Sequence, residues 1–124
     1  MHLRIAIAGS RSITDYNQLI IAVTHSIKQG IIPPASSFEI VSGGAKGVDM
    51  LARRYASELN YKLTELKPQY RGPKDRGAPL RRNIDIALYS DILIAIWDGS
   101  SPGTSHIISE MKKLDKPTYI HIVP

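Results

Sequence analysis

The chain has 124 residues and a net charge of +5, with 43% hydrophobic and 22% charged residues. This balance predicts one globular domain over residues 1–124, and the basic excess favours acidic partners such as nucleotides or nucleic acid. The absence of cysteine excludes disulfides, thiolate metal sites and a cysteine nucleophile. No stretch is long enough for a membrane span or a secretory signal, so we expect a cytoplasmic protein.

Hydrophobic periodicity and turn residues predict five strands that alternate with four helices. In chain order, the expected elements are a strand over 3–8, a helix over about 14–29, a strand over 38–41, a helix over about 48–59, a strand over 61–66, a helix over 78–89, a strand over 91–97, a helix over about 104–114 and a strand over 117–123. Strict alternation of this kind requires a parallel sheet with helices on both faces.

The strand sequences also predict their order in the sheet. The strand after Asp91 is almost unbroken apolar sequence, and the strand of Leu3, Ile5 and Ile7 has small apolar residues between them, so both are expected to be central. The strand over 61–66 alternates polar and apolar residues, as edge strands do. We therefore predict a doubly wound, Rossmann-like α/β sheet in the order 3-2-1-4-5, with a ligand crevice between strands 1 and 4.

Two helices carry specific expectations. In the first, Ser12 or Thr14 is the predicted N-cap, and the apolar face consists of Tyr16, Leu19, Ile20, Val23 and Ile27. In the helix over 78–89, the residues predicted to point inward are Leu80, Ile84, Ala87 and Leu88.

The stretch from Ser42 to Asp49 is the strongest local signal. It places Gly43, Gly44 and Gly47 between an apolar strand and a helix. Glycine permits positive φ and lets a ligand approach the backbone, while the start of a helix favours negative charge. The turn predicts a phosphate or nucleotide cradle; a tight turn without a ligand is the alternative. It is not a Walker A loop, because no Lys-Ser/Thr follows the last glycine.

Two further small, polar loops are expected at the same edge of the sheet. Gly9-Ser10-Arg11 follows the first strand, and the segment from Asp98 to Thr104 follows the fourth. The carboxyl ends of parallel strands share one edge, so all three loops should converge on the crevice.

These motifs, together with Arg81-Arg82-Asn83 and Trp97-Asp98-Gly99, resemble those of the SLOG superfamily, and in particular its small bacterial and phage YspA-like proteins. That superfamily includes the lonely-guy phosphoribohydrolases and the DNA-processing protein that loads recombinase. The resemblance implies binding of a nucleotide or nucleotide derivative, and it implies a homo-oligomer. The candidate ligand-binding residues are Gly9, Ser10, Arg11, Ser42, Gly43, Gly44, Ala45, Lys46, Gly47, Asp49, Arg81, Asn83, Asp98, Gly99, Ser101, Gly103, Thr104 and Ser105.

The expected roles follow from the chemistry of these residues. Backbone donors of the glycine turn and of 103–105 are expected to hold phosphate, with Arg11 and Arg81 closing on it bidentately. Asp49 is a partner of its helix dipole or a ribose ligand. Asp98 either caps its own turn or accepts from a sugar or base.

Whether the chain is an enzyme depends on a departure from the phosphoribohydrolase pattern. Those relatives place a glutamate pair two and three residues after the Gly-x-Gly-Thr threonine, where this chain has His106 and Ile107. Glu110 is the nearest carboxylate, and it is the catalytic candidate if the chain hydrolyses an N-glycosidic bond. We expect binding, as a sensor or sequestering module, rather than hydrolysis.

A basic segment over 71–82, preceded by Tyr70, indicates a third possibility, single-stranded DNA binding. A solvated basic loop without a ligand is the alternative. The four histidines lack metal-ligand spacing, so no metal site is expected, and no cofactor is predicted.

Overall fold

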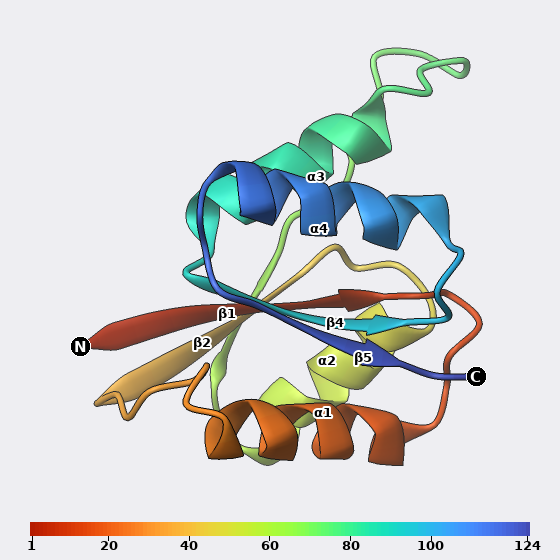
Figure 1. Cartoon of the computed structure of the whole chain (residues 1–124). Helices are drawn as coiled ribbons and strands as arrows, with labels where there is room; N and C mark the ends of the chain where they lie inside the picture. The colour runs from red at the N-terminus through yellow and green to blue at the C-terminus, as the bar shows by residue number, and fades with distance from the viewer.

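The computed structural model describes residues 1–124, and the chain forms one five-stranded parallel sheet. Figure 1 shows this sheet between two layers of helices. The strand order is β3-β2-β1-β4-β5, which confirms the predicted fold class and order. The elements are β1 His2–Gly9, α1 Tyr16–Lys28, β2 Ser37–Ser42, α2 Val48–Glu58, β3 Lys62–Glu65, α3 Ala78–Tyr89, β4 Ile92–Trp97, α4 Pro102–Lys113 and β5 Thr118–Ile122.

The two faces of the sheet carry separate cores. Helices α1 and α2 cover one face, where Leu19 and Ala52 pack with Ile7 and Ile94. Helices α3 and α4 cover the other face, where Ile86 and the α4 residues pack on β4. Strand β4 is buried along its length apart from Trp97 at its end, as a central strand covered on both sides must be.

The N-cap of helix α1 lies one residue after Thr14, the later of the two predicted caps. Asp15 is the N-cap, and its carboxylate accepts from the Asn17 N–H at 3.0 Å, so the expected caps Ser12 and Thr14 are wrong. Ile20 and Ile27 are exposed rather than buried. The smaller residues Ala22 and Ser26 occupy the contact face instead and bring the helix close to the sheet.

Helix α3 is turned differently from the prediction. Leu80, Ile84 and Leu88 are 47%, 39% and 60% exposed, so their expected inward orientation is wrong, while Ala87 is buried as predicted. The other buried residues of the helix are Ala78, Asn83 and Ile86. Small side chains on this flank let α3 pack beside α4, and the larger aliphatic side chains are left on the outer flank.

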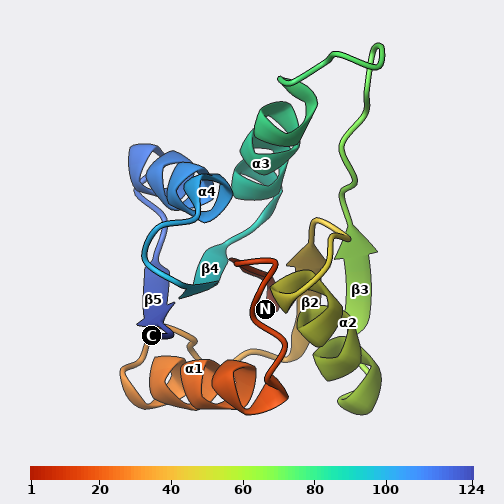
Figure 2. The ribbon, with the colours of Figure 1, turned by 90° about the vertical axis from the view of Figure 1, so that its right-hand side faces the viewer.

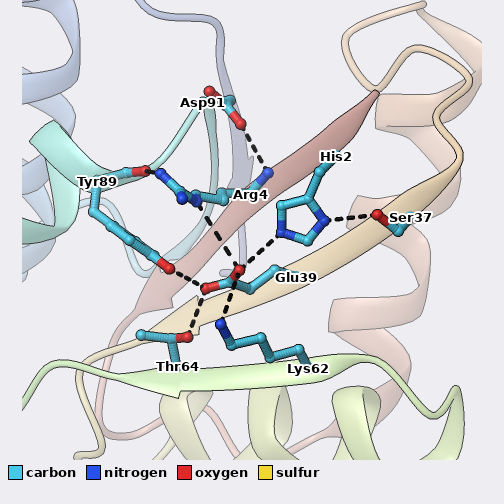
Figure 3. A network of polar contacts seen from close by, with 8 residues as sticks. All are labelled: His2, Arg4, Ser37, Glu39, Lys62, Thr64, Tyr89 and Asp91. Carbon is cyan, nitrogen blue, oxygen red and sulfur yellow. Dashed lines mark hydrogen bonds and ion pairs between the residues drawn. The ribbon is translucent and has the colours of Figure 1, made fainter.

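A buried carboxylate lies at the opposite end of the sheet from the β-strand carboxyl ends. Glu39 of β2 is 1% exposed and accepts hydrogen bonds from Thr64 Oγ1 (2.6 Å), Tyr89 OH (2.5 Å) and His2 Nε2 (2.9 Å) (Figure 3). Lys62 and Arg4 add positive charge at 3.7 and 3.9 Å. Burial alone would raise the pKa of Glu39, but these hydrogen bonds outweigh it and lower the pKa to about 2. The network ties the end of α3 to three neighbouring strands.

Candidate functional site

A crevice of about 460 Å³ lies beyond the carboxyl ends of β1, β2 and β4, between their loops and the first turns of α3 and α4. Its walls come from all five of these segments. The lining residues are Ala8, Gly9, Ser10, Arg11, Ser12, Gly43, Ala45, Asp49, Pro79, Leu80, Arg82, Asn83, Ile86, Ser101, Pro102, Gly103, Thr104 and Ile107. The three predicted loops therefore converge at the β1–β4 switch point, as the strand order requires.

The first loop holds the other two together through Ser10. Its N–H donates to Ile96 O at 3.1 Å, and its hydroxyl accepts from the Asp98 N–H at 3.0 Å. Its carbonyl accepts from the N–H of Val48, at the start of α2, at 3.4 Å. Ser10 is 1% exposed, so this side chain fixes the relative positions of the loops rather than offering a free group to a ligand.

The glycine turn is held internally. Gly44 and Gly47 have φ of 72° and 70°, and a Cβ on Gly47 would lie 2.4 Å from Arg11 O, so glycine is required there by close backbone contact. The Ala45 N–H donates to Asp49 Oδ2 at 3.0 Å, and the Gly44 N–H donates to Ser42 Oγ at 3.3 Å. These two donors, which we expected to serve a phosphate, are occupied by nearby side chains.

Asp49 completes this turn from the first turn of α2. The residue is 8% exposed, and burial raises the pKa of its carboxyl, although the Ala45 N–H and the nearby Arg82 charge act against that shift. It is the one carboxylate among the lining residues. Its hydrogen bonds give it a role within the loop that its sequence position did not reveal.

Arg82, and not Arg81, lines the crevice. The Arg82 guanidinium donates to Gly43 O at 2.8 Å from Nη1 and to Asn83 Oδ1 at 3.0 Å from Nε, and burial lowers its pKa. Arg81 instead pairs with Asp75 at 2.5 Å, and the pKa of that carboxyl falls to about 2 chiefly because of this hydrogen bond. The predicted contact from Arg81 is therefore not brought into the crevice.

The third loop, which begins at Asp98, leads into the first turn of α4. The Asp98 carboxylate accepts from the N–H groups of Ser100 and Ser101 at 2.9 and 2.7 Å, and from the Ser101 hydroxyl at 2.7 Å. This is the turn-capping role, and the hydrogen bonds, led by that hydroxyl, lower the pKa of Asp98. The N–H groups of Gly103 and Thr104 have no acceptor in the protein, so the first turn of α4 offers free donors at the crevice.

Asn83 connects α3 to the first turns of α4 through its side-chain amide. Its side-chain amide donates to Gly103 O at 3.3 Å and contacts His106 Nδ1 at 3.2 Å, while its oxygen accepts from Arg82. The residue is 7% exposed. Asn83 therefore holds Arg82 and the α4 terminus in place with hydrogen bonds that are already satisfied.

Several predicted residues lie outside the lining. Glu110 pairs with His106 at 3.4 Å and with Lys113 at 3.5 Å, away from the crevice. The others outside the lining are Ser42, Gly44, Lys46, Gly47, Arg81, Asp98, Gly99 and Ser105. No three His, Asp or Glu side chains are grouped as metal ligands would be.

The apolar wall of the crevice and the half-buried Arg82 were not among the predicted site residues. Pro79, Leu80, Ile86, Pro102 and Ile107 line the crevice, and none of them was predicted as a ligand-binding residue. Arg82 follows the predicted residue Arg81 in the sequence. Successive residues of a helix point in different directions, so only one of these two arginines faces the crevice. Ala8 and Ser12 were also missed, although they flank a predicted loop.

The fold and this crevice define a Rossmann-like α/β protein. A family model described as the YspA, cpYpsA-related SLOG family matches residues 3–71, more than half of the chain, and the chain belongs to that family.

Solved structures agree with this fold. The DNA processing protein A of Helicobacter pylori, described with a single-stranded DNA binding mode, has a TM-score of 0.67 and 25% identity over 95% of this chain. TM1055, a structural genomics target, has a TM-score of 0.65 and 16% identity over 94% of this chain. The matches cover 64% and 72% of those chains, respectively.

No curated protein matches the sequence. None of the helices has the length and apolar character needed to cross a membrane.

Proposed function

We propose that the protein binds a nucleotide or a nucleotide-derived ligand in this crevice. The observation that carries the proposal is the convergence of free N–H donors at Gly103 and Thr104 with the half-buried Arg82 guanidinium. A helix N-terminus attracts anions, and arginine binds phosphate through two parallel hydrogen bonds. Arg11 lines the same space and forms no ion pair, so it adds a second available cation.

The rest of the lining fits a ligand larger than a simple anion. Pro79, Leu80 and Ile86 of α3 give the crevice an apolar wall. Small-molecule sites combine such apolar surface with a few convergent polar groups. A base or sugar against the wall and a phosphate at α4 would use both parts of the crevice.

Binding, for sensing or sequestration, is favoured over hydrolysis by the placement of the carboxylates. Asp49 is committed to the N–H groups of the glycine turn. Glu110, the catalytic candidate if the protein were a phosphoribohydrolase, is paired outside the lining. Neither is free to assist the departure of a base.

The proposal is tested with two neighbouring arginines. Calorimetric titration of wild type with nucleoside monophosphates of the four common bases should show saturable binding of at least one. Arg82→Ala should weaken that binding by about 1.5–3 kcal/mol, because a charge-assisted contact is lost. Arg81→Ala is the matched control, since its guanidinium pairs with Asp75 outside the crevice. Absence of binding by any monophosphate, or equal losses in the two variants, would contradict the proposal.

Single-stranded DNA binding is the second candidate. The segment between β3 and α3 extends away from the sheet, past the N-terminal end of α3 (Figure 2). It carries exposed Arg71, Lys74 and Arg76 beside Tyr70, which is 61% exposed. Exposed cations next to an aromatic ring suit a nucleic-acid strand. The similarity to DNA processing protein A supports this candidate as well.

We also propose that the protein forms a homo-oligomer through the outer flank of α3. Leu80, Ile84 and Leu88 recur every fourth residue and make one exposed aliphatic stripe. Such a stripe is self-complementary when two copies meet around a two-fold axis at Ile84. The contact would place two crevices near one another, because Leu80 belongs to both surfaces.

A further inference from the structure

A second hollow, of about 340 Å³, lies on the other side of the N-terminal half of α3. It is formed by the segment after β3 and by the helix, and its character is basic. The lining residues are Lys67, Gln69, Arg71, Ala78, Arg81, Arg82, Ile84 and Asp85. Four of these side chains are cationic, and Asp85 is the one acidic residue among them.

The hollow adjoins the crevice. Arg82 lines both spaces, and its Nη1 donates to the carbonyl of Gly43, which also lines the crevice. A Cβ on Gly44 would lie 3.1 Å from Lys67 Cε, so the aliphatic stem of Lys67 rests on the glycine turn. The guanidinium of Arg82 and the stem of Lys67 are therefore the boundary between the two spaces.

The cations of the hollow are not all neutralised. Asp75 pairs with Arg81, but Lys67 and Arg71 form no ion pair. The same Asp75 carboxylate accepts from the Arg71 N–H at 3.0 Å and so fixes the backbone that carries Arg71. Two available cations are thus held on a loop anchored to α3, beside a guanidinium that faces both spaces.

We propose that this hollow is a second phosphoryl subsite, and that the ligand is a nucleotide bearing a second phosphoryl group, as in a nucleoside diphosphate or a pyrophosphate-linked nucleotide. The inference rests on the proposed function of the crevice. One phosphate lies at the first turn of α4, the next lies near Lys67 and Arg71, and Arg82 contacts both. A guanidinium has five N–H donors, and the two that Arg82 gives to Gly43 O and Asn83 Oδ1 leave three for phosphate oxygens.

The test compares matched ligands and matched variants. Titrations use the four nucleoside monophosphates and the corresponding diphosphates. Wild type should bind the preferred diphosphate about tenfold more tightly than its monophosphate, and Lys67→Ala or Arg71→Ala should remove most of that difference. Monophosphate affinity should be unchanged in Arg71→Ala, because Arg71 lines the hollow and not the crevice. Lys74→Ala is the control, because it removes an exposed lysine of the same segment that does not line this hollow.

The outcomes separate this inference from the proposed function. Monophosphate binding with no gain for the diphosphate, or a gain that Lys67→Ala and Arg71→Ala leave intact, overturns the subsite while the crevice assignment stands. If those two variants weaken binding of an oligo-dT strand and of no diphosphate, the hollow serves a nucleic acid and the subsite is wrong. Failure of every nucleotide to bind would refute the crevice itself.

Discussion

Gly43 sits where one added methyl group would act on the proposed site. A Cβ there would lie 2.4 Å from Arg82 Nη1, the donor to Gly43 O, and 3.1 Å from Asp49 Oδ2. The end of an arginine side chain can move, so we expect Gly43→Ala to fold while displacing Arg82 and weakening nucleotide binding by about 1–3 kcal/mol. Gly72→Ala, with nothing within 4 Å of its Cβ, is the control. Unchanged nucleotide affinity in a folded Gly43→Ala protein would show that the position of Arg82 does not affect binding.

Glu39 predicts a specific acid dependence of stability. Its pKa is about 2 in the folded protein against an ordinary value of 4.5, so folding favours the ionised form. The resulting stabilisation is complete above about pH 4.5 and is lost as the pH falls toward 2. Tyr89→Phe removes one donor, which should cost about 1.5–3 kcal/mol near neutral pH and less as the pH approaches 2.

Urea unfolding at several pH values between 2 and 7 measures this effect. Tyr119→Phe is the control, because that hydroxyl contacts His25 at 3.2 Å on the other face of the sheet. A difference between wild type and Tyr89→Phe that stayed constant down to pH 2 would mean that Glu39 is not the group responsible.

At the scale of elements, α3 shows what sequence could and could not predict. Strand order followed from the sequence, because the continuous apolar run of β4 and the alternation of β3 differ clearly. Helix α3 has aliphatic residues on two flanks, Ile86 and Ala87 on one and Leu80, Ile84 and Leu88 on the other. Hydrophobic periodicity identifies the helix but does not show which of the two flanks packs against the core. The choice depends on packing against α4, and it also decides whether Arg81 or Arg82 faces the crevice.

The glycine turn shows a second limit. Its position between β2 and α2 was evident from composition, and so was its place at the switch point. The direction of its N–H groups depends on where the Asp49 carboxylate lies, which needs the conformation of a side chain. Sequence therefore located the turn but could not distinguish a ligand cradle from an internally bonded loop.

The outer flank of α3 supplies the element-scale prediction. Ile84→Glu places a charge at the centre of the aliphatic stripe, and repulsion between two copies should shift the protein toward monomer. Light scattering coupled to size-exclusion chromatography gives the mass of each form. Met50→Glu is the control, since Met50 has the same 39% exposure on α2. A wild-type protein that is monomeric at high concentration would remove the basis for an α3 interface.

At the scale of the whole molecule, the net charge of +5 sets an expectation for salt. A compact nucleotide engages few phosphates, so its affinity should fall modestly between 50 and 200 mM salt. A long strand recruits many phosphates and should lose affinity by orders of magnitude over about that range. Titrations with mononucleotides and with oligo-dT at both salt concentrations separate the two candidates. Steeply salt-dependent binding to oligo-dT alone would favour the DNA candidate.

The pairing of β1 with β4 has a consequence for the time course of folding. The hydrogen bond between Ser10 and Asp98 that joins two loops of the crevice spans 88 residues, and the pairing of Arg4 with Asp91 spans 87. Contacts this distant in sequence form slowly, because a long loop must close before they stabilise the chain. Helices α1 and α2 can form earlier, but the crevice cannot exist until this closure occurs. In stopped-flow refolding, binding of the proposed nucleotide ligand should therefore return no earlier than the phase in which these long-range contacts form.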